Sequence, residues 1–150
     1  MPPIIIRPAT PADCPRMLEL VHELAIYEHA PDEVTISLEH FTESCFGANP
    51  VCWAIVAETE GQVVAFALWY TRFSTWKGQK MYLEDILVTE EWRSKGIGTM
   101  LMNELIRIAK EKGFKGISWQ VLEWNKPAIS FYKNYKAAFD GEWLNVTIDV

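Results

Sequence analysis

The spacing of hydrophobic and polar residues along the chain predicts an alternation of strands and helices. Runs rich in β-forming residues predict strands at 4–7, 51–58, 62–70, 80–88, 116–122 and 143–150. Apolar residues recur at helical spacing over 10–27, 37–45 and 97–112, and a fourth helix is expected from residue 125. Residues 72–78 are expected to form a loop. The order β-α-α-β-β-β-α-β-α-β predicts a mixed α/β sheet.

The length and composition of the chain are those of a globular domain. Its 150 residues, 49% of them hydrophobic, are enough for a full core, so we expect one domain over residues 1–150. No apolar run reaches about 18 residues, so we expect no transmembrane helix and no membrane partner. The apolar run at residues 4–6 is too short for the core of a signal peptide.

The charge balance narrows the class of ligand. Acidic residues outnumber basic ones, 20 against 14, and this net charge of -6 argues against a nucleic-acid partner. The balance is compatible with attracting cations, and equally with a role in solubility alone. The three cysteines lack CxxC spacing and the three histidines lack a metal-ligand pattern. We therefore expect no metal, no disulfide framework and a reducing, cytoplasmic location.

A glycine-containing turn joins the strand at 80–88 to the helix at 97–112. Its pattern is Arg93-x-x-Gly96-x-Gly98, in which glycine allows positive φ and close approach of a ligand. The free N–H groups and the dipole at the start of the helix favour an anion. The dinucleotide pattern G-x-G-x-x-G and the Gly-Lys-Ser/Thr of triphosphate loops are both absent. We therefore expect a phosphate-bearing ligand other than NAD or ATP.

The turn resembles the R/Q-x-x-G-x-G/A turn that binds the pyrophosphate of acetyl-CoA in the GCN5-related N-acetyltransferase (GNAT) superfamily. The chain also resembles the spermidine/spermine N1-acetyltransferase branch, which includes thialysine acetyltransferases. The matching segments are Arg7-Pro8-Ala9-Thr10, Glu23-Leu24-Ala25 with Tyr27-Glu28, Trp76-x-Gly78, Tyr82-Leu83-Glu84-Asp85, Glu123-Trp124-Asn125-x-Pro127 and Phe131-Tyr132-Lys133. The resemblance spans about residues 4 to 148 and implies a GNAT fold, a central mixed, mostly antiparallel sheet flanked by helices.

The resemblance also implies which residues contact acetyl-CoA. Residues Ile86, Leu87 and Val88 would lie along the cofactor, with backbone groups of Ile86 and Val88 facing the pantetheine arm and the thioester. Asn125 and Ala128 would line its far side. Arg93 and Lys95 would add positive charge at the phosphates, and the alternative for Lys95 is a solvated turn residue. The turn residues that would hold the pyrophosphate are Arg93, Ser94, Lys95, Gly96, Ile97, Gly98 and Thr99.

Acetyl transfer to an amine requires a base, because an alkyl ammonium has a pKa of about 10. Glu84 matches the family position for this base, and the alternative is an exposed residue in an ion pair. In a regular strand Asp85 would point to the opposite face. The family carries a bulge in this strand that could re-aim its neighbours. Asp85 is therefore either a substrate ligand or a structural acid.

Tyr132 matches the family's general acid for the departing CoA thiolate. A phenol has a pKa of about 10 and a thiol a pKa of about 8.5, so donating the proton to the departing thiolate costs only about 1.5 pKa units. The alternative is a core aromatic whose hydroxyl reaches the surface.

The expected amine site combines carboxylates with aromatic faces. A polyamine carries several ammonium groups on an apolar stem, so it requires spread charges rather than one deep acid pocket. Tyr27 and Glu28 match the amine-binding segment of the branch, and Glu84 and Asp85 would add carboxylates. Trp76 could pack on the methylenes, although each tryptophan could equally be a core residue.

Two positions depart from the family. Lys136 stands where the family usually has a glycine at the end of the helix. The left-handed residue that ends the helix therefore costs extra free energy at Lys136 or shifts to Asn134. The segment that follows is shorter than in the polyamine enzymes and lacks a clear match to one of their substrate acids. Asp140 or Glu142 could replace that acid.

The leading hypothesis is an acetyl-CoA-dependent acyltransferase that acetylates a primary amine of a small polyamine, diamine or thialysine-like substrate, without a metal. One alternative is acetylation of a peptide or protein amine. Another is a CoA-binding sensor without turnover, which the presence of both Glu84 and Tyr132 disfavours. The resemblance further implies a homodimer.

Overall fold

The computed structural model describes all 150 residues and divides into two compact units, residues 1–119 and residues 120–150. The first unit holds a five-stranded sheet in the order β1-β2-β3-β4-β5. Neighbouring strands are antiparallel except β4 and β5, which run parallel. The strands are β1 (Ile5–Pro8), β2 (Trp53–Thr59), β3 (Gln62–Ser74), β4 (Gly78–Val88) and β5 (Ile117–Ser118). The expected mixed, mostly antiparallel sheet is therefore confirmed.

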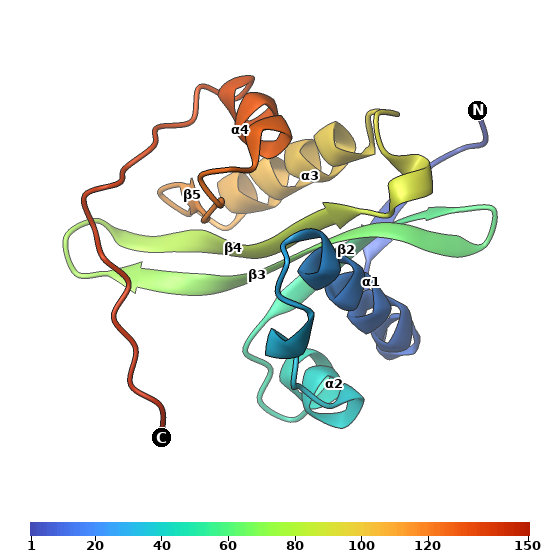
Figure 1. Cartoon of the computed structure of the whole chain (residues 1–150), viewed down its shortest axis with the longest axis horizontal. Coiled ribbons are helices and arrows are strands. Elements are labelled where there is room, and N and C mark those ends of the chain that lie inside the picture. Colours follow the sequence, from blue (N-terminus) through green and yellow to red (C-terminus); the bar gives the residue numbers. More distant parts are fainter. The chain divides into compact units, whose positions relative to one another are not determined.

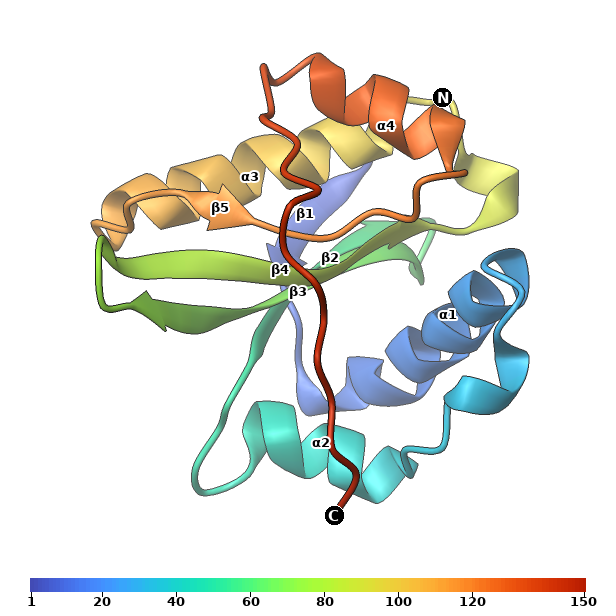
Figure 2. The same cartoon turned by 60° about the vertical axis from the view of Figure 1, so that its left-hand side comes forward.

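Three helices cover this sheet. Helices α1 (Cys14–Tyr27) and α2 (Leu38–Phe46) lie on one face, and α3 (Ile97–Glu111) lies on the other (Figures 1 and 2). Short 3-10 turns occur at η1 (Pro11–Asp13), η2 (Pro31–Glu33) and η3 (Glu90–Trp92). None of the helices in the chain combines the length and the apolar character of a membrane span.

The core forms where the helices meet the central strands. Every residue of β3 from 63 to 69 is buried, as expected for a strand covered on both faces. Helix α1 buries Met17 and Leu20, and α3 buries Leu101 and Leu105, each pair at helical spacing. The helical periodicity in the sequence therefore marks the buried faces correctly.

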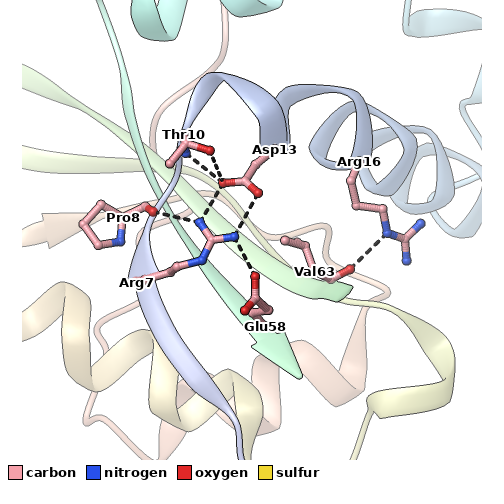
Figure 3. A network of polar contacts seen from close by, with 7 residues as sticks. All are labelled: Arg7, Pro8, Thr10, Asp13, Arg16, Glu58 and Val63. Carbon is pink, nitrogen blue, oxygen red and sulfur yellow. Dashed lines mark hydrogen bonds and ion pairs between the residues drawn. The ribbon is translucent and has the colours of Figure 1, made fainter. Parts of the chain in front are cut away.

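A network around Arg7 fixes the start of the chain against the sheet. The guanidinium of Arg7 donates to both carboxylate oxygens of Asp13, at 2.8 and 3.0 Å, and to Glu58 at 2.9 Å (Figure 3). The same Asp13 carboxylate accepts from the backbone N–H of Thr10 at 2.8 Å. Arg7 lies on β1, Asp13 on η1 and Glu58 on β2, so one side chain joins three elements.

The hairpin of β3 and β4 is longer than the sequence suggested. Pairing continues to Ser74 opposite Gly78, so the loop expected over 72–78 shrinks to residues 75–77. The expectation was wrong because exposed polar and aromatic residues favour a loop by composition, whereas an antiparallel ladder needs only backbone groups.

A β-bulge interrupts the same hairpin. Leu68 pairs with Asp85 and Trp69 pairs with Leu83, so Glu84 is the extra residue of β4 without a partner on β3. A bulge bends the strand and re-aims the side chains beside it. The bulge that the resemblance implied is therefore present at Glu84.

The second unit contains one helix, α4 (Lys126–Lys133). The side chain of Asn125 caps it by accepting from the N–H of Ala128 at 3.4 Å, and Pro127 lies in the first turn. After the helix, Lys136 has φ 57 while Asn134 has φ -64. The left-handed residue therefore stays at Lys136 and does not shift to Asn134.

Two sequence predictions fail near the C-terminus. The strand expected at 116–122 is reduced to two residues of β5, and the strand expected at 143–150 does not form. Apolar alternation defines the face of a strand but supplies no hydrogen-bonding neighbour, without which a strand is not stable. Four large apolar side chains of this segment are more than three-quarters exposed: Trp143, Leu144, Val146 and Ile148.

Candidate active site

The turn between β4 and α3 presents an open surface of backbone groups. Gly96 adopts the left-handed conformation, with φ 84, and precedes the first residue of α3. The first intrahelical bond runs from Met100 N–H to the carbonyl of Gly96 at 3.1 Å, so the preceding N–H groups are available to a ligand. A Cβ placed on Gly96 would meet no atom within 4 Å, and Ser94 and Lys95 are exposed. These features suit a phosphate at the start of α3.

Arg93 does not extend freely from this turn. Its Nε donates to the carbonyl of Val88 at 2.9 Å, and its Nη2 lies 3.6 Å from the carboxylate of Glu23. Its guanidinium lies over the ring of Tyr27, 5.4 Å from the ring centroid. The side chain therefore links the end of β4 to helix α1.

Glu23 is a residue that sequence reasoning did not assign to the site. Its carboxylate accepts from the hydroxyl of Thr89 at 2.9 Å and from the N–H of Glu90 at 3.0 Å. Glu90 begins η3, so Glu23 supplies the cap for that turn from a different helix. The available signal was its place in the motif Glu23-Leu24-Ala25, which gave no indication of a contact 66 residues away.

Three carboxylates, Glu28 after the end of α1 and Glu84 and Asp85 at the bulge of β4, form a cluster that we call the acidic group. Burial, together with the charges of Glu84 and Glu28, raises the pKa of Asp85 to about 6. Burial also raises the pKa of Glu28. The carboxylates of Glu28 and Glu84 are therefore close enough to Asp85 for their charges to act on it. Such spread negative charge suits an amine with more than one ammonium group.

Two tyrosines that sequence reasoning did not select lie beside this group. Tyr70 and Tyr82 face each other across β3 and β4, with ring centroids 5.1 Å apart. Burial raises the pKa of both phenols, and the charge of Glu84 adds to the rise. Their position could have been inferred only from the strand register, because they are adjacent through β-pairing rather than in sequence.

Trp76 is not brought to the acidic group. It lies in the loop before β4 and is 87% exposed. At a rise of about 3.3 Å per residue, the stretch of β4 from Gly78 to Glu84 spans about 20 Å. Its contact with the amine stays a prediction, although the core alternative is wrong for this tryptophan.

The remaining candidate residues belong to the second unit. Tyr132 lies on α4 and is buried, with its ring 5.7 Å from that of Phe131. Asn125 is buried as the cap of that helix and holds the N–H of Ala128. The catalytic role of Tyr132 and the cofactor contacts of Asn125 and Ala128 stay predictions.

Comparisons with known proteins agree with this architecture. Residues 15–136 match the model of the acetyltransferase (GNAT) family. The chain is 41% identical to thialysine N-epsilon-acetyltransferase of Bos taurus over 87% of this chain and 81% of that protein. It is 32% identical to spermidine/spermine N(1)-acetyltransferase-like protein 1 of Homo sapiens, over 85% of this chain and 19% of that protein.

Solved structures share the fold. An integron cassette protein of V. cholerae aligns with a TM-score of 0.79 at 24% identity, covering 98% of this chain and 93% of that one. An aminoglycoside acetyltransferase from an uncultured soil metagenomic sample aligns with a TM-score of 0.78 at 19% identity, covering 98% and 96%. The family match and the similar sequences together establish that this chain belongs to the GNAT family of acetyltransferases.

Proposed function

We propose that this acetyltransferase transfers an acetyl group from acetyl-CoA to a primary amine of a small polyamine, diamine or thialysine-like substrate. The observation that carries the proposal is the group of three carboxylates, Glu28, Glu84 and Asp85, at the bulge of the strand that leads into the phosphate-binding turn. The names of the similar proteins support the same substrate class.

The cofactor half of the site follows from the turn. The N–H groups of residues 94–99 and the dipole of α3 would hold the pyrophosphate of acetyl-CoA, and Lys95 would add positive charge. Upstream of the turn, the residues Ile86, Leu87 and Val88 would face the pantetheine arm. Acetyl-CoA supplies the activated acetyl group, and no cluster of His, Cys, Asp or Glu that could hold a metal occurs in the structure.

The amine half of the site has to bind a cation and then remove its proton. Glu28 and Asp85 would bind the ammonium groups, while the ring of Tyr27, 37% exposed, offers a face to the methylene stem. Glu84 is the exposed residue of the bulge and would accept the proton of the bound ammonium, directly or through water, to free the amine that attacks. Tyr132 would donate a proton to the departing sulfur.

A panel of amines tests the proposal. Purified protein is mixed with acetyl-CoA and with monoamines, diamines of increasing length, polyamines, thialysine and lysine-containing peptides, and the free thiol is measured. We expect thiol release with diamines or thialysine, and a higher KM for a monoamine of equal length because it lacks the second ammonium group. If none of the amines causes thiol release, the proposed function is refuted. If only the peptides cause it, the protein-acetylating alternative is favoured.

A matched pair of variants connects the activity to the carboxylates. Glu28→Gln removes one charge from the acidic group, and Glu39→Gln removes one exposed charge from α2. We expect the first to raise the KM for diamines and the second to leave it unchanged. Equal KM values for both variants would show that the acidic group does not bind the amine. Tight acetyl-CoA binding without any thiol release would instead support a sensor.

We further propose that the protein acts in the cytoplasm as a homodimer. The row of exposed apolar side chains at 143–148 supports self-association, because such residues are normally buried against a partner. Three free cysteines are compatible with a reducing compartment. Sedimentation at several protein concentrations tests the dimer, and a single species with the mass of one chain would exclude it.

A further inference from the structure

Arg93 belongs to the phosphate-binding motif, but its side chain is directed toward the amine half of the site. Its three contacts are the carbonyl of Val88, the carboxylate of Glu23 and the ring of Tyr27. Val88 ends β4, whereas Glu23 and Tyr27 lie on α1. None of these groups is an anion-binding donor, and one of them is a carboxylate that offsets the charge of Arg93.

Glu23 and Tyr27 are four residues apart on α1, so both point toward the same side of that helix. Glu23 also accepts from Thr89 and Glu90, which come immediately after β4. The guanidinium thus contacts groups that connect α1 to the end of β4. We call Glu23, Tyr27, Thr89 and Arg93 the clasp.

We propose that Arg93 is a positioning residue that holds Tyr27 and the end of α1 for the amine, rather than a ligand of the cofactor's phosphates. The inference rests on the proposed function, because Tyr27 is placed there at the amine. Its basis is geometric: the side chain of Arg93 is held by the backbone carbonyl of Val88 at 2.9 Å and by the ring of Tyr27, with the carboxylate of Glu23 at 3.6 Å. Arginine is suited to the clasp because it can donate from Nε while stacking its planar group on a ring.

Two acetyl donors separate the alternatives. Acetyl-CoA carries phosphates and S-acetylpantetheine carries none, so a phosphate ligand affects only the first. For Arg93→Ala we expect the KM of the diamine to rise about tenfold with either donor, as loss of a cation–π contact and a hydrogen bond implies. The Kd of acetyl-CoA should stay within about twofold of the original value. A much weaker Kd for acetyl-CoA with an unchanged diamine KM would overturn the proposal.

A double-mutant cycle tests the link to Tyr27. If Arg93 acts through that ring, Arg93→Ala has little further effect on the diamine KM in a Tyr27→Ala background. Lys110→Ala, which removes a positive charge from the exposed last turn of α3, is the control and should change no kinetic parameter. Fully additive effects of the two clasp variants would contradict the proposal.

Amide hydrogen exchange gives a readout that does not depend on turnover. In the protein without ligands, Arg93→Ala should speed exchange over residues 24–30, where α1 ends, and Lys110→Ala should not. Unchanged exchange over this segment would show that Arg93 does not hold α1, whatever the activity. If exchange rises but no amine is acetylated, the clasp stands and the proposed function fails.

Discussion

Glu84 and Asp85 are adjacent carboxylates on a bulged strand, and the charge of Glu84 raises the pKa of Asp85. Burial is the main cause that raises the pKa of Asp85 to about 6, and the charge of Glu84 is the next. The bulge places Glu84 outside the regular pairing, where it is exposed while Asp85 is partly buried. The two acids therefore occupy different environments, which suits one to binding and the other to proton transfer.

Asp85 should make stability depend on pH. Its pKa of about 6 in the folded state lies above the ordinary value of 3.8, so the folded state binds the proton more tightly. Protonation of Asp85 therefore favours the folded state. This contribution to stability is fully present below pH 3.8 and is lost as pH rises through about 6. At pH 8, Asp85→Asn should raise the free energy of unfolding by about 1 to 3 kcal/mol, measured as a higher urea midpoint. At pH 4 the variant and the original protein should differ little.

The control for this measurement is Asp149→Asn, because Asp149 is an exposed carboxylate. It should leave the urea midpoint unchanged at both pH values. A gain from Asp85→Asn that is the same at pH 4 and pH 8 would exclude titration of Asp85 as its cause.

Glu84→Gln should act on turnover. The change keeps the size and exposure of the side chain but removes the group that accepts the proton of the ammonium. We expect kcat at neutral pH to fall by about 10²- to 10⁴-fold, with partial recovery at high pH as more of the free amine is already deprotonated. Steady-state rates from pH 7 to 10 test this expectation. An unchanged kcat would assign the base to another residue.

Tyr132→Phe should separate catalysis from cofactor binding. The substitution removes one hydroxyl and keeps the buried ring. If the hydroxyl protonates the departing sulfur, kcat falls by about 10²-fold or more while the Kd of acetyl-CoA changes little. Calorimetric titration with acetyl-CoA and single-turnover rates provide the two quantities. Equal losses in both would indicate a binding role instead.

Local sequence patterns predicted the elements well but not their partners. The helical stripes of α1 and α3 and the turn at Gly96 follow from spacing and from glycine chemistry, and all are present. The failed strand at 143–150 and the unforeseen contact of Glu23 with Thr89 share one cause. Each depends on which distant segment lies alongside, and periodicity along the chain does not specify that. Arg93 shows the same limit at the site, because its motif indicates a phosphate whereas its contacts involve α1.

Lys136→Gly should stabilise the protein. Lys136 has φ 57, a conformation that costs a residue with a Cβ about 1 kcal/mol and costs glycine little. We expect the free energy of unfolding to rise by about 0.5 to 1 kcal/mol, measured with urea. Lys133→Gly is the matched control, because Lys133 has helical geometry at the end of α4 and glycine there should destabilise by a similar amount. A loss of stability in both variants would show that the glycine cap does not offset the greater freedom of the unfolded chain.

The network around Arg7 yields a prediction about acid sensitivity (Figure 3). The Arg7 guanidinium is the main cause that lowers the pKa of Asp13, whose side chain is only 10% exposed. This stabilising contribution is present above pH 3.8 and is lost as pH falls through the lower pKa of the folded state. Arg7→Met leaves Asp13 buried without its cation, so we expect a loss of about 3 kcal/mol at pH 7.

That loss should shrink in acid, because a protonated Asp13 no longer requires the cation. Urea unfolding of Arg7→Met and the original protein at pH 7 and pH 3 tests the expectation. Asp13→Asn is the companion variant: its amide oxygen can still accept from Thr10 and Arg7, so its loss at pH 7 should be the smaller of the two. If Arg7→Met loses the same stability at both pH values, the side chain of Arg7 contributes by packing its methylenes rather than by pairing with Asp13.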